Sequence, residues 1–136
     1  MIEDIYVTLE TARLLKEKGF DEPCNQTYAV HPSYDEPIVM FNDAATNSKG
    51  VFGAVFPTIA SAPTQAMVLM WLREKHHIII SPKPNSFSCG GECKSWSYDI
   101  WADDNFEEYN ENFPTYEDAV EAAIKYCLTT ENYIRD

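Results

Sequence analysis

The stretch SAPTQAMVLMWLREKHHIII (residues 61–80) decides the fold class, because a helical pattern in it passes directly into a strand pattern. Apolar side chains surround its first half on all sides, which is typical of a buried central helix. We expect this helix over residues 61–76, with Ser61 as the N-cap. The isoleucines at 78–80 then predict a strand, because β-branched residues favour extended backbone, and Pro82 is expected to end it.

Two further helices are expected on either side of this stretch. The first covers residues 8–18, where Thr8 is the N-cap and Gly19 adopts the left-handed conformation that ends a helix. The second covers residues 115–128, where apolar residues recur three and four positions apart behind a cap at Thr115. Each helix has one apolar side to bury against a sheet.

The remaining segments predict short strands and loops. Strands are expected at 28–31, 38–41, 51–56 and 78–80, with 87–101 as the second half of a hairpin or meander, and loops at 21–27 and 103–112. The predicted fold is α+β and two-layered, with three helices on a mostly antiparallel sheet of about five short strands. Helix 61–76 could also join the strands at 51–56 and 78–80 in one right-handed crossover. The length predicts a single domain over 1–136.

The charge balance excludes several classes of partner. Ten basic and 22 acidic residues give a formal charge of −12, which repels nucleic-acid phosphates and anionic membrane surfaces. Apolar runs stay far below the roughly 18 residues of a membrane-spanning helix. The first residues, MIEDIYV, carry acids where a signal peptide carries bases. We therefore expect a cytoplasmic protein without nucleic-acid or membrane partners.

Three segments resemble known sequences. VTLETARLLKEKGFDEPC (residues 7–24), AMVLMWLREKHHI (66–78) and YEDAVEAAIKYCL (116–128) resemble a group of small uncharacterised proteins of Bacteroides-type gut bacteria and their phages. The segments cover about a third of the chain and are helical motifs, not site motifs. The resemblance implies a phage- or prophage-borne protein and transfers no functional residue.

The four cysteines are expected to be free thiols in a cytoplasmic protein. Cys89 and Cys93, with His76 and His77 upstream, form a candidate zinc site, but their spacing matches no standard finger. A tight turn through the glycines between the two cysteines is the favoured alternative, so neither a metal nor a cofactor is predicted. Cys24, in a predicted loop, is the candidate reactive thiol, whereas Cys127 lies on an apolar helix face.

One segment combines acidic and aromatic residues. Residues 95–124 hold nine acids and no lysine or arginine, with aromatic residues among them. Aromatic anchors dominate interface energetics, so an acidic aromatic surface predicts binding to a basic protein surface. The predicted binding residues are Trp101, Asp103, Asp104, Glu107, Glu108, Tyr109 and Glu111. The alternative is that these rings pack back onto the core.

The sequence thus predicts a non-catalytic, acidic protein-interaction protein. A small-molecule-binding protein or an enzyme is the first alternative, and it requires a concave pocket with convergent polar groups. A small zinc-binding protein built on Cys89 and Cys93 is the second. No catalytic residue is predicted, because the phosphate-binding glycine loops and the nucleophile elbow are absent from the sequence.

Overall fold

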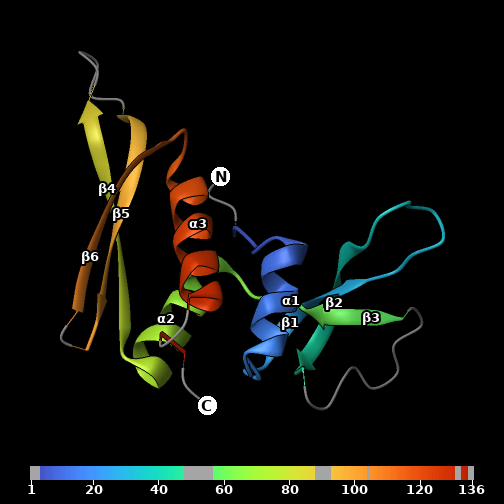
Figure 1. Cartoon of the computed structure of the whole chain (residues 1–136). Helices are drawn as coiled ribbons and strands as arrows, with labels where there is room; N and C mark the ends of the chain where they lie inside the picture. Colours follow the sequence, from blue (N-terminus) through green and yellow to red (C-terminus); the bar gives the residue numbers. More distant parts are fainter. Residues whose placement is uncertain (1–3, 48–56, 88–92, 104, 131–132, 135–136) are drawn as a thin grey trace. The chain divides into compact units, whose positions relative to one another are not determined.

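The computed structural model describes residues 4–47, 57–87, 93–103, 105–130 and 133–134. By their internal contacts the described residues divide into two compact units, those up to residue 64 and those from residue 65 on (Figure 1). Each unit combines helix and antiparallel sheet, and each is described by itself.

The first unit packs one helix on a three-stranded sheet. Helix α1 (Leu9–Glu17) begins where the Thr8 side chain accepts a hydrogen bond from the Thr11 backbone N–H. Strands β1 (Cys24–Ala29), β2 (Ile38–Ala45) and β3 (Thr58–Ser61) form a sheet in the order β2-β1-β3, with both pairings antiparallel. Gly19 has a φ of 91°, which confirms the predicted left-handed end of the helix.

The second unit packs two helices on a meander. Helix α2 (Gln65–His76) leads into β4 (Ile78–Phe87), β5 (Cys93–Ala102) and β6 (Asn105–Phe113), which pair in that order, and helix α3 (Tyr116–Thr129) closes the unit. In Figure 1, α3 lies along one face of the β4–β5–β6 sheet. Ile80, Tyr98 and Ile100 are buried, whereas their neighbours Ile79 and Trp101 are exposed. This alternation defines an inner face, which carries α3, and an outer face.

The α+β class, the three helices and the antiparallel pairing are confirmed within the described residues. The strands lie in two sheets instead of one. The predicted strand at 51–56 lies outside the described residues. The crossover predicted between 51–56 and 78–80 therefore also lies partly outside the described residues. The described strands on either side of α2, which are β3 and β4, belong to different sheets. The single domain stays a prediction, since two compact units can belong to one folding domain.

Helix α2 differs from the prediction in its start and in its burial. It begins at Gln65, because Ser61 belongs to β3 and pairs with Thr27 of β1. It is also not buried all round, because Met70 is exposed while Val68 and Leu72 are buried. An uninterrupted apolar run therefore overstated how much of this helix the unit covers.

Three strands extend through residues that were expected to be turns or loops. β4 continues through Pro82 and Pro84, which an edge strand tolerates because a proline there loses no ladder hydrogen bond. β1 starts at Cys24, inside the loop predicted at 21–27. The predicted acidic loop at 103–112 is wrong, because residues 105–113 form β6. Each face of this strand combines an acid with an aromatic residue, Phe106 with Glu108 and Glu107 with Tyr109, and pairing with β5 overrides the weak strand propensity of the acids.

No helix in the described ranges is long and apolar enough to cross a membrane.

Candidate functional site

The outer face of the β4–β5–β6 sheet carries a row of exposed apolar side chains. Ile79 on β4 pairs with Trp101 on β5, which pairs with Phe106 on β6. The three residues are 51%, 49% and 46% exposed. The rings of Trp101 and Phe106 are in contact, with centroids 4.2 Å apart. The register thus gathers three large apolar side chains from three strands, and we call Ile79, Trp101 and Phe106 the apolar row.

A charged group lies two residues further along the same face. Lys83 on β4 reaches across β5, and its Nζ lies 3.0 Å from Asp99 Oδ1 and 2.8 Å from Glu108 Oε1. Asp99 and Glu108 are direct partners in the register. One ammonium thus faces two carboxylates, which raises the pKa of Lys83 and leaves the group with a net charge of −1. We call Lys83, Asp99 and Glu108 the charged group.

The far end of the outer face is polar. Asn85 on β4 accepts a hydrogen bond from the Ser97 hydroxyl at 2.6 Å and donates to Asn112 Oδ1 at 2.9 Å. Its amide also lies 3.3 Å from the Glu111 carbonyl. Side chains from all three strands are therefore cross-linked over the sheet at this end. The outer face changes from apolar to charged to polar along its length.

Glu107 points to the opposite, inner face, where tyrosine hydroxyls surround its carboxylate. Tyr109 donates to Glu107 Oε2 at 2.5 Å and Tyr126 of α3 donates to the same oxygen at 3.0 Å. The hydrogen bonds from Tyr109, Tyr133 and Tyr126 lower the pKa of Glu107, because they stabilise its charged form. The carboxylate therefore ties β6 to α3 and to Tyr133 near the C-terminus.

Tyr98, Tyr109 and Tyr133 have raised pKa values. Burial raises the pKa of Tyr98 to about 12, and nearby carboxylates add to the effect. Burial and the bond to Glu107 also raise the pKa of Tyr109 and of Tyr133. The rings of Tyr98 and Tyr109 are stacked with centroids 4.9 Å apart, and those of Tyr109 and Tyr126 lie 4.7 Å apart. All these shifts keep the phenols protonated as donors, which suits a structural cluster better than an acid–base site.

The predicted binding residues divide between the two faces. Trp101 and Glu108 lie on the outer face, whereas Glu107 and Tyr109 lie on the inner face and are hydrogen-bonded to each other. Asp103 and Glu111 are exposed, and Asp103 has a φ of 52° at the turn between β5 and β6. Asp104 lies outside the described residues. Four of the residues predicted as one surface therefore lie on two opposite faces, because successive residues of a strand point to opposite sides of the sheet.

Sequence reasoning did not assign Ile79, Lys83 or Phe106 to the site. Ile79 and Lys83 come from β4, which lies outside the acidic segment. Phe106 was placed in a loop, where its direction is undefined. Residues 106–109 gave no period-2 signal, because each face of the strand carries one ring and one acid: Phe106 and Glu108 share one face, and Glu107 and Tyr109 share the other.

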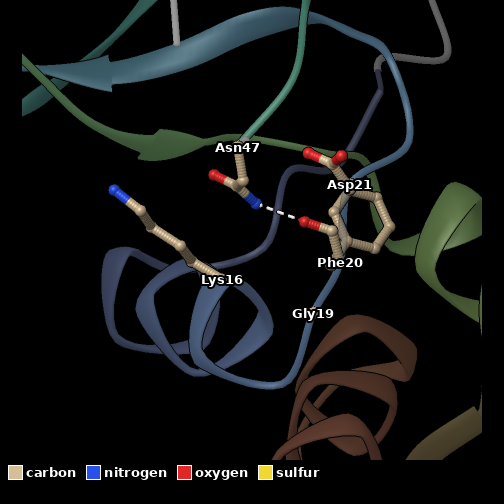
Figure 2. Close-up of a pocket in the computed structure, with 5 residues that line it drawn as sticks. All are labelled: Lys16, Gly19, Phe20, Asp21 and Asn47. Carbon is tan, nitrogen blue, oxygen red and sulfur yellow. Dashed lines mark hydrogen bonds between the residues drawn. The ribbon is translucent and has the colours of Figure 1, made fainter. Parts of the chain in front are cut away.

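A pocket in the first unit is the main alternative site. It has a volume of about 330 Å³ and is lined by Lys16, Gly19, Phe20, Asp21 and Asn47 (Figure 2). Its polar side chains hold backbone groups in place. Asn47 donates to the Phe20 carbonyl at 2.6 Å and accepts from the Ser61 N–H at 2.9 Å. Lys16 Nζ donates to the Ile59 carbonyl at 2.9 Å. The pocket residues thus join α1 to β3. The tyrosines with raised pKa values lie in the second unit and not at this pocket.

The cysteines are arranged differently from the prediction. Cys24 was the candidate reactive thiol, but it is buried in β1, and burial raises its pKa. Cys127 is in the core as predicted, and burial raises its pKa to about 12.

Cys89 lies outside the described residues, so the candidate zinc site is not described. His76 ends α2 with its ring 4.5 Å from that of Trp71. Among the residues described, no three His, Cys, Asp or Glu side chains form a group able to hold a metal.

Comparisons of the chain with protein-family models, with curated proteins and with solved structures gave no match. The resemblance of the three helical segments to phage and gut-bacterial proteins therefore stays a prediction.

Proposed function

We propose that this chain is a non-catalytic protein-interaction protein, and that the outer face of its β4–β5–β6 sheet binds a basic protein surface. The observation that carries the proposal is the apolar row beside the charged group. Ile79, Trp101 and Phe106 are each about half exposed and are in register on three strands. Large aromatic side chains held by a rigid sheet supply contact area at low entropic cost, which favours them as interface anchors.

The charge around the apolar row supports a basic partner. The charged group has one more carboxylate than ammonium groups, and residues 103–113 hold five acids and no lysine or arginine. A chain of formal charge −12 attracts cationic surfaces over the range of the Debye length, about 10 Å at 0.1 M salt. At close contact, burial of the apolar row then stabilises the complex through the hydrophobic effect.

The test is a comparison of captured proteins. Lysate of the source cells is passed over the immobilised wild-type chain, over the double variant Trp101→Ser/Phe106→Ser, and over Phe41→Ser as the control. Phe41 is an exposed aromatic residue of β2, so its replacement removes a similar exposed ring elsewhere. Circular dichroism is used to check that each variant is folded.

We expect basic proteins that the wild-type chain and Phe41→Ser retain, that the double variant loses, and that elute as salt is raised. The proposal is refuted if all three chains retain the same proteins. It is also refuted if the proteins lost by the double variant are acidic, or if they resist salt.

A further inference from the structure

We infer that the partner binds as an extended basic strand added to the edge of β6. This inference rests on the proposed function and specifies how the partner is recognised. In strand addition the peptide's main chain pairs with the sheet edge, while alternate side chains contact the adjoining face. The edge of β6 and the apolar row meet at Phe106.

The two edges of the described sheet differ in their ability to accept a strand. β4 and β6 are the outer strands in the order β4-β5-β6. Pro82 and Pro84 on β4 lack the N–H groups that a new strand would need. β6 contains no proline between Asn105 and Phe113. Prolines thus protect one edge from strand addition, and the other edge has no such protection.

The register shows which way the backbone of Phe106 points. Pro82 pairs with Tyr98 and has no N–H, so this pair is of the non-hydrogen-bonded kind. Residues of the central strand direct their backbone groups to alternate sides. Tyr98 therefore directs its groups toward β6, and Trp101, three residues later, directs its groups toward β4. The pair Trp101–Phe106 is then also non-hydrogen-bonded, and Phe106 turns its N–H and C=O away from β5, toward the edge.

The side chains beside this edge define the sequence that a partner needs. Phe106 and Glu108 lie two residues apart, on the outer face of β6. An added strand places one residue opposite Phe106 and another opposite Glu108, also two residues apart. The first position favours an apolar side chain, which extends the apolar row. The second favours lysine or arginine, which meets the negative charged group. In an antiparallel partner the order is basic, any residue, apolar.

A second copy of this chain is a poor occupant of the edge. Pairing two β6 strands would bring together two chains of formal charge −12, and β6 contains three acids and no basic residue. Like charges facing one another across a strand pair are destabilising. Charge complementarity therefore selects a basic segment of another protein.

The experiment uses a fluorescent peptide of about nine residues as the probe. Threonine occupies its odd positions, because threonine favours strands, and lysine and valine alternate at its even positions. A twin peptide has glutamate in place of lysine. Two further versions carry N-methyl groups on the odd or on the even backbone nitrogens, so that only one of them blocks pairing with β6. Binding is measured by fluorescence anisotropy at low salt.

The protein variants are Phe106→Pro and Phe106→Leu. Proline removes the N–H that points to the edge and leaves the bonds to β5 in place, whereas leucine keeps both the N–H and an apolar side chain. We expect the lysine peptide to bind wild type and Phe106→Leu similarly, and Phe106→Pro at least about tenfold more weakly, a loss of about 1.4 kcal/mol. The glutamate twin and one N-methylated version should also bind at least about tenfold more weakly.

A measurement on the wild-type chain does not depend on any variant. Adding the lysine peptide should slow hydrogen exchange of the Phe106 amide, because that N–H becomes bonded. Strand addition is refuted if the wild-type chain does not bind the lysine peptide, if both N-methylated versions bind as well as the parent, or if exchange at Phe106 is unchanged. Lysate proteins that Trp101→Ser/Phe106→Ser loses but Phe106→Pro retains would refute strand addition alone and leave the proposed function standing.

Discussion

Replacing Tyr126 by phenylalanine should destabilise the second unit, because it removes one hydroxyl from the Glu107 carboxylate. The lost hydrogen bond is 3.0 Å long and its acceptor is charged. Hydrogen bonds to charged groups contribute about 1.5–3 kcal/mol. Glu107 keeps its bond from Tyr109 and is not left uncompensated, so the lower end applies. We expect a loss of about 1.5 kcal/mol, or roughly 5 °C in Tm for a protein of this size.

The assay is urea unfolding followed by circular dichroism and by intrinsic fluorescence, with Tyr116→Phe as the matched control. Tyr116 lies on the same helix, and its side chain is exposed. The control should change the free energy of unfolding by less than about 0.5 kcal/mol, as is usual for surface positions. The variant Glu107→Gln completes a double-mutant cycle with Tyr126→Phe, and the coupling energy should be well above zero.

The dependence on pH gives the same prediction a second test. The pKa of Glu107 is lowered from 4.5 in the folded state, so its stabilising contribution is fully present above about pH 4.5 and is lost as pH falls through the folded pKa. The difference between wild type and Tyr126→Phe should therefore shrink as Glu107 becomes protonated in the folded state. The reasoning is refuted if Tyr126→Phe costs no more than Tyr116→Phe, or if the difference stays the same once Glu107 is protonated in both folded chains.

Two further predictions concern the outer face and the thiols. Lys83→Met should strengthen binding of the lysine peptide at low salt, because it leaves Asp99 and Glu108 without their shared cation, and weaker binding would contradict the charge argument. In a chain with Cys89→Ser and Cys93→Ser, neither Cys24 nor Cys127 should react with a thiol reagent near pH 8 until urea unfolds the protein. Both are buried and burial raises both pKa values, so fast reaction of the native chain would show that the described burial is wrong.

The helices were predictable from the sequence because their signals are local. Thr8 and Thr115 cap α1 and α3 as expected, since each hydroxyl accepts a hydrogen bond from an N–H only three residues away in the sequence. Ser61 carries the same chemistry but belongs to β3, where its pairing with Thr27 depends on residues far away in the sequence. Capping chemistry thus identified helix starts except where a strand partner competed for the same residue.

Proline was a poor guide to the end of β4 for a related reason. Whether a strand tolerates proline depends on which side of it has a neighbour, and that is a property of the sheet. Pro82 and Pro84 lie two residues apart, so both missing N–H groups point to the same side of β4. That side is the edge. The prolines that were expected to end the strand therefore show which side of β4 faces away from β5.

The candidate site was predictable in composition but not in arrangement. The excess of acids and aromatics around residues 99–111 is visible in the sequence, but a count of charges has no direction. Once residues 105–113 are a strand, neighbours have opposite environments: Glu107 accepts hydrogen bonds from tyrosines on the inner face, and Glu108 shares Lys83 with Asp99 on the outer face. The two carboxylates are adjacent in sequence, yet the first is bonded to the tyrosines of the inner face and the second belongs to the face that we propose for recognition. Pairing with β5, and not charge density, therefore decides which acids of the segment are available to a partner.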